Sequence, residues 1–205
     1  AGVCWACYAG ILRFLMSLES MGDLATTLYL FAIAIVLALL EVQIEGPDGW
    51  ASKLPTWRLL NPRLLAWTNG KPVTGYHVCM IGLLLLMFHF PAVRGPWSWR
   101  AEGELLSQFF LVAVFWDFLW FVLNPHYGLR RFRAGEVWWC KRWALGLPVD
   151  YWSGLAVSAG LGAASGNPGL GHGAQVWAVS FGVLCALTLL SAAIAHPWTG
   201  APRTR

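Results

Sequence analysis

Five runs of about twenty residues with almost no charged side chains are the strongest constraint on how this chain folds. They are residues 24–44, 75–93, 104–124, 149–165 and 174–195. About twenty residues of α-helix cross the hydrocarbon core of a bilayer, so each run is predicted to be a transmembrane helix. The predicted fold is an all-α, polytopic integral membrane bundle of about five transmembrane helices with interfacial amphipathic segments.

The composition agrees with a membrane protein and disfavours a nucleic-acid-binding one. Only 12% of the 205 residues are charged, which is about half the fraction of a soluble domain. The 14 Trp residues suit membrane–water boundaries, where amphipathic rings settle. The net charge of +4 could suggest nucleic acid, but the basic residues lie in short loops between apolar runs, so we interpret them as topology signals.

The runs define one transmembrane domain, residues 23–198. Residues 1–22 are predicted to be an N-terminal interfacial segment or an extension, and residues 199–205 a loose C-terminal tail. The loops 50–74 and 127–148 combine Trp with Lys and Arg and are predicted to lie at the interface. Within the second loop, residues 136–145 suit a helix in the headgroup plane.

The basic residues also predict an orientation. If five spans alternate, three of the 14 Lys and Arg residues fall on one side and eleven on the other. Cytoplasmic loops carry the excess of Lys and Arg, so the second side is predicted to be cytoplasmic. The N-terminus would then be outside and the C-terminus cytoplasmic, in the plasma (inner) membrane.

Asp117 is the most informative single residue, because it interrupts the aromatic and aliphatic run 115–123. A carboxylate at that depth is costly and is usually functional or paired. Arg130 or Lys141 could fold back to pair with it. Helical spacing puts it on one stripe with other residues of the run. These are Ser107, Val114, Phe121 and Asn124.

Topology brings further polar residues to the same membrane level as Asp117. Glu41 ends the first run, His77 begins the second, and Asn124 and His126 end the third. We predict Asp117, Glu41, His77, Asn124 and His126 as catalytic residues. The predicted metal ligands are His77, His126, Glu41 and Asp117, and imidazoles with carboxylates suit Zn, Fe or Mn. Asn124 would orient a ligand or the substrate.

Several observations limit the metal, haem and redox interpretations of this sequence. None of the compact metal-binding motifs is present, and each ligand comes from a different helix. Glu45 and His196 lie at span edges and are interpreted as hydrated. Haem is disfavoured, because His77 and His89 have no matching pair on a second helix. Cys4 and Cys7 have redox-motif spacing without the flanking strand and helix of a redox site.

Three functions remain open at this level. The favoured one is an enzyme acting on a lipid, isoprenoid or other hydrophobic substrate, with Trp120 and Phe121 lining an apolar tunnel. A transporter or a proton or metal carrier is the second, although it would need polar groups through the whole bilayer depth. The third is a structural or accessory subunit, with a partner helix packed on a ladder of small residues. That ladder is Gly154, Ser158, Gly162 and Gly166. The basic loops suit anionic lipid headgroups or simply set the topology.

Overall fold

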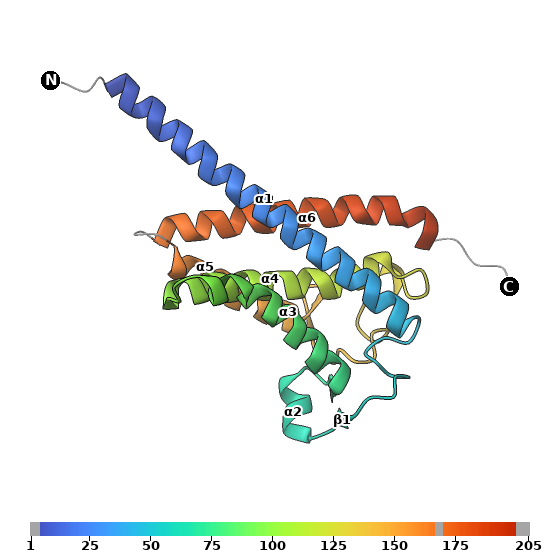
Figure 1. Ribbon diagram of the computed structural model, residues 1–205. Helices are drawn as coiled ribbons and strands as arrows, with labels where there is room; N and C mark the ends of the chain where they lie inside the picture. Colours follow the sequence, from blue (N-terminus) through green and yellow to red (C-terminus); the bar gives the residue numbers. More distant parts are fainter. Residues whose placement is uncertain (1–4, 167–169, 200–205) are drawn as a thin grey trace.

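The computed structural model describes the backbone of residues 5–166 and 170–199, and the side chains of residues 23–166 and 173–196. Helices dominate these ranges (Figure 1). They are α1 (Trp5–Glu45), α2 (Pro62–Trp67), α3 (Gly75–Arg94), α4 (Trp99–Leu123), α5 (Val149–Ser165) and α6 (Leu170–Thr199), with a 3₁₀ turn at Leu129–Arg131. Two short antiparallel hairpins pair β1 (Arg58–Leu59) with β2 (Val73–Thr74) and β3 (Trp143–Ala144) with β4 (Leu147–Pro148). The prediction of a mainly helical fold is confirmed, with two short hairpins in addition.

Within the described part of the chain, four helices are long and apolar enough to cross a membrane. They are Asp23–Glu45, Gly75–Arg94, Trp99–Leu123 and Gly173–His196, and they coincide with four of the five predicted runs. α5 coincides with the remaining run but has 17 residues. Apolar helices of this length indicate a membrane-embedded protein.

α4 is the centre of the bundle, because it packs against α1, α3, α5 and α6. On one side Val112 and Leu119 join residues of α1 and α3 in a buried cluster. On another, Leu111 and Phe115 pack against Leu184 of α6. Accordingly, the α4 span is more buried than the other three candidate spans.

α5 lies along the predicted stripe of α4, held by close contacts between small and polar residues. The hydroxyl groups of Ser107 and Ser158 each donate to the other residue's carbonyl oxygen at 2.7 Å. Further along the two helices, Val114 of α4 lies against Gly154 of α5. A Cβ atom added to Gly154 would lie 2.8 Å from the Val114 side chain. The small-residue ladder therefore packs on α4 within the chain, and its use by an outside helix stays a prediction.

Two long loops interlock at one end of the bundle (Figure 1). Asn69, in the first loop, donates to the carbonyl oxygen of Arg142 and accepts from the backbone N–H of the same residue. Trp139 of the second loop fills the space above Gly49, and Trp138 donates to the carbonyl oxygen of Asp48. The two loops lie on the same side of the bundle, as the alternation of spans predicts.

The helix predicted at residues 136–145 is wrong. This stretch forms turns and then β3. Gly135 and Gly146 adopt φ values of 87° and 82°, a left-handed conformation that ends regular helix on both sides. The backbone groups of Arg142 bond to Asn69 and are not available to a helical ladder.

The terminal predictions fall partly outside the described residues. α1 runs without a break from Trp5 into the first span, and the interfacial placement of residues 1–22 stays a prediction. The Cys4 and Cys7 pair lies outside the described side chains, as does most of the tail 199–205.

Asn69→Ala is expected to destabilise the fold more than an ordinary loop substitution. Asn69 is 2% exposed, and its amide bonds to Arg142 and to Asp150. Loss of this side chain leaves buried groups unsatisfied and should lower the unfolding free energy by about 2–3 kcal/mol. Thermal unfolding in detergent micelles would measure the change. Asn61→Ala, which removes an exposed cap of α2, is the matched control and should cost about 1 kcal/mol. Equal effects of the two variants would contradict the central role of Asn69.

Candidate functional site

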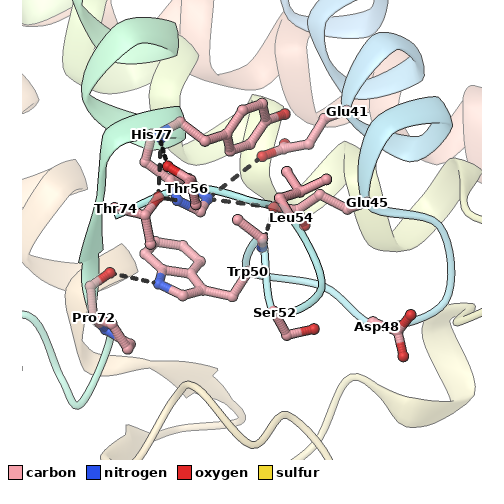
Figure 2. A network of polar contacts seen from close by, with 12 residues as sticks. Glu41, Glu45, Asp48, Trp50, Ser52, Leu54, Thr56, Pro72, Thr74 and His77 are labelled. Carbon is pink, nitrogen blue, oxygen red and sulfur yellow. Dashed lines mark hydrogen bonds and ion pairs between the residues drawn. The ribbon is translucent and has the colours of Figure 1, made fainter. Parts of the chain in front are cut away.

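Three ionisable side chains meet where α1 ends and α3 begins (Figure 2). Glu41 and Glu45 occupy the last two turns of α1, and their spacing of four puts them on one helix face. His77 lies in the first turn of α3. The apolar sequence of both helices ends in this region, so their polar ends come together at one depth.

The ring of His77 is held on two sides. Thr74 caps α3 by accepting from the backbone N–H of His77, and its Oγ1 lies 2.7 Å from the Nδ1 atom of the same residue. The Trp50 ring stacks on the imidazole at a centroid distance of 4.0 Å, and the Trp50 Nε1–H donates to the Pro72 carbonyl. These contacts fix the ring with Nε2 directed at the two glutamates (Figure 2).

Trp50 and Ala51 reach the site through a strained turn. Both adopt positive φ, 47° and 50°, a conformation that costs a non-glycine residue about 1 kcal/mol or more. The turn places the Ala51 N–H 2.5 Å from Glu45 Oε1, to which it donates. The strain is therefore associated with orienting Glu45 and with seating Trp50 on His77.

The geometry of the triad suits a metal ion. His77 Nε2 lies 3.8 Å from Glu41 Oε1 and 3.5 Å from Glu45 Oε1, and the three ligand atoms all lie within 4.8 Å of one another. Ligands about 2.1 Å from a tetrahedral ion are about 3.4 Å apart. His77 Nε2 is buried and has no hydrogen-bond partner, so it has a free position toward the carboxylates.

A second polar group lies beside the triad. Tyr151 of α5 donates to Asp117 Oδ2 at 2.5 Å. Lys71 forms an ion pair with Asp150 and lies over the Trp50 ring. Asp117 therefore meets a tyrosine and a nearby lysine, and not the Arg130 or Lys141 that the sequence suggested.

Lys71 and Cys140, which lie outside the spans and near Asp117 and Asp150, have shifted pKa values. Burial alone would lower the pKa of Lys71, but nearby Asp117, Cys140 and Asp150 reverse this and hold it above the ordinary value. Lys71 is therefore charged at neutral pH. Burial raises the pKa of the Cys140 thiol to about 12, so this thiol stays protonated and is a poor nucleophile at neutral pH.

Glu41 and His77 of the triad and the residues of the second polar group line one cavity of about 590 Å³. Its polar end includes Glu41, His77, Lys71, Asp117, Asp150 and Tyr151. The remaining wall is mainly apolar and comes from α3, α4 and α5. Ligand-binding cavities commonly combine such an apolar wall with a few convergent polar groups.

The structure brings together three of the five predicted site residues. Glu41, His77 and Asp117 line the same cavity. Asn124 is instead buried at the end of α4, where it donates to the Gly46 carbonyl and accepts from the backbone N–H of His126. That arrangement is a helix cap.

His126 is exposed and is not among the residues that line the cavity. Trp120 and Phe121 are buried in an aromatic cluster with Tyr127 and Trp139, away from the cavity wall. The structure therefore brings Glu41, His77 and Asp117 to one cavity, whereas Asn124 and His126 lie outside its lining.

Sequence reasoning missed four contributors, which are Glu45, Lys71, Asp150 and Tyr151. Glu45 was interpreted as hydrated, although its spacing from Glu41 was the available signal. Lys71 was counted among the basic residues of an interfacial loop and Asp150 was not considered, and only their pairing across 79 residues brings them together. His89, also considered in the haem interpretation, pairs with Glu102 at the other end of α3.

Comparison of this chain with protein-family models, with curated proteins and with solved structures finds no match. Its function is therefore argued from the chemistry of the site.

Lys71→Met is expected to destabilise the protein, and a second substitution should restore part of the loss. The Lys71 side chain is 9% exposed and that of Asp150 is 30% exposed. Removing the cation leaves a partly buried carboxylate unpaired, at a cost of about 2 kcal/mol after allowance for solvent screening. The neutral amide that Asp150→Asn introduces could still accept from Asn69, so Lys71→Met with Asp150→Asn should be more stable than Lys71→Met alone. Unfolding midpoints of the two single variants and the double variant provide the measurement, and strictly additive losses would refute a coupled pair.

Proposed function

We propose that this membrane protein binds one divalent transition-metal ion through Glu41, Glu45 and His77, and that it is an enzyme acting on a hydrophobic substrate held in the adjoining cavity. One observation carries the proposal. A buried imidazole nitrogen without a hydrogen-bond partner faces two carboxylates at distances suited to a shared ion.

The number and type of ligands favour catalysis over a structural role. Structural zinc sites usually have four protein ligands, whereas catalytic sites have three and leave a position for water or substrate. One imidazole with two carboxylates suits Zn, Fe or Mn. A bound ion of this kind supplies Lewis acidity and lowers the pKa of a coordinated water.

Residues around the triad support orientation and proton transfer. Thr74 holds the imidazole through Nδ1, the outer-shell interaction that fixes a metal-binding histidine. The Ala51 N–H does the same for Glu45. Asp117 and Tyr151 share a hydrogen bond within the cavity and would exchange a proton with the substrate.

We also propose how the bundle is oriented in the membrane and that it has a fifth span. The interlocked loops carry most of the Lys and Arg residues, and by the positive-inside rule the end with the triad would face the cytoplasm. α5 would be the fifth transmembrane helix, and its first turn carries Asp150 and Tyr151 to the level of the site.

A carrier of metal ions or protons is the second candidate. A smaller, more polar cavity of about 210 Å³ is lined by Asp23, Arg100 and Glu104 among others, toward the other end of α4. It shares no lining residue with the larger cavity. A carrier would need the two cavities to connect, so metal-dependent uptake into liposomes would favour it over the enzyme.

Metal analysis of the purified protein tests the proposed centre. We expect about one divalent ion per chain after reconstitution with Zn, Fe or Mn in turn. Glu41→Gln, Glu45→Gln and His77→Ala should each lower the stoichiometry, because each removes one of three ligands. His89→Ala, at the other end of α3, is the control and should retain the ion. Absence of stoichiometric metal in the unsubstituted protein would overturn the proposal and favour an accessory subunit.

Thr74→Val should weaken metal affinity without removing a ligand. Outer-shell partners of metal-binding histidines typically contribute about 10–100-fold in affinity. Thr74→Ser retains the hydroxyl and should bind metal like the unsubstituted protein, so the pair separates orientation of His77 from general damage to the α3 cap. Competition against a chelator of known affinity gives the ratio. Equal affinities for the Val and Ser variants would refute the positioning role of Thr74.

A further inference from the structure

The larger cavity continues from the polar end along the membrane-spanning part of α4. Its apolar wall is Val78 and Ile81 of α3, Phe109, Phe110, Ala113 and Val114 of α4, and Gly154 and Val157 of α5. Between Phe109 and Asp117 the helix rises about 12 Å. α3 and α5 both pack on α4, and the apolar wall lies between them. Its length of about 12 Å corresponds to a segment of a lipid chain.

The rim of this wall faces the membrane. Val78, Ile81 and Val157 are 48%, 42% and 44% exposed, and the first two lie on a candidate span. A chain dissolved in the bilayer can therefore enter sideways between α3 and α5. The polar end lies beyond Asp117, at the membrane boundary where a head group would be.

We infer that the cavity binds a single-chain amphiphile with an uncharged oxygen head group, namely a long-chain alcohol or aldehyde, and discriminates against anionic lipids. This inference rests on the proposed function and names its substrate class. The chain would lie along α4, and the head oxygen would reach Glu41 and His77.

The charges at the polar end carry the choice of head group. Glu41, Asp117 and Asp150 line the cavity, and Glu45 adjoins them. The only cationic side chain among the lining residues is Lys71. Four carboxylates with one ammonium leave a formal excess of three negative charges, and a divalent ion would reduce it to one. An anionic head group would therefore meet net repulsion.

Hydrogen-bonding capacity leads to the same conclusion. An anionic head needs several donors, but Lys71 is committed to Asp150 and the Tyr151 hydroxyl to Asp117. A carboxylate only accepts hydrogen bonds. An alcohol can donate to a carboxylate oxygen, and either an alcohol or an aldehyde can offer a lone pair to a cation held by three ligands.

A competition experiment tests this selectivity. Tritiated hexadecanol would be bound to the metal-loaded protein in nanodiscs of zwitterionic lipid. Unlabelled hexadecanol and hexadecanal are expected to displace it, whereas hexadecanoate and hexadecyl phosphate should compete at least about tenfold more weakly. Equal or stronger competition by the two anions would overturn the inference.

Two variants locate the binding. Ala113→Phe places a ring in the cavity and should lower hexadecanol binding at least tenfold. Val179→Phe, on a 61% exposed part of α6, is the matched control and should not alter it. Metal content and unfolding midpoint would be measured for both. Unchanged binding in a folded Ala113→Phe protein would overturn the inference.

Photo-crosslinking keeps the inference falsifiable if Ala113→Phe does not fold. A hexadecanol with a diazirine near the middle of its chain should label peptides containing Ile81, Phe110 or Val157 in the unsubstituted protein. Labelling confined to other surfaces, or a protein helix crosslinked in the cavity in its place, would overturn it. Stoichiometric metal without selective alcohol binding would refute this inference alone, whereas absence of metal would refute the proposed function whatever the lipid result.

Discussion

The concentration of carboxylates at one end of a membrane bundle is the constraint on which the rest of this structure depends. Glu41, Glu45, Asp117 and Asp150 lie close together where apolar helices end, and water cannot solvate all of them. An ionised carboxylate without a partner in such a place is strongly unfavourable. Glu45, Asp117 and Asp150 each have a hydrogen-bond or ion-pair partner, and the loops at this end provide several of these partners.

The interlocking of the loops follows from that requirement. Asn69 joins the two loops and also donates to Asp150, so the segment carrying Lys71 is held against the start of α5. The same segment leads through β2 into α3 and sets the position of Thr74 and His77. Loss of order in either loop would thus separate the charges that stabilise the site. In agreement with this role, Asn69 is among the most buried polar residues of the described chain.

Helix positions were predictable from the sequence, whereas the contacts of the loops were not. Hydropathy alone locates long apolar helices, and helical spacing correctly put Ser107, Val114 and Asp117 on the face that meets α5. Topology brought Glu41, His77 and Asp117 to one level, and the structure places them in one cavity. The helix predicted at residues 136–145 is wrong because the Trp and Lys pattern of this stretch resembles that of an interfacial helix. Contacts distant in sequence, such as that between Arg142 and Asn69, determine its turns.

The remaining physical question is what neutralises the triad, and the distances bear on one answer, an ion pair between a charged imidazole and the carboxylates. A protonated imidazole would form hydrogen bonds to carboxylate oxygens at about 2.7–2.9 Å. The observed separations from His77 Nε2 are 3.5 and 3.8 Å, too long for such bonds and close to the spacing of ligands around a shared ion. The strained turn at Trp50 and Ala51 is consistent with the proposed centre, because metal sites depend on neighbours that hold their ligands in a fixed geometry.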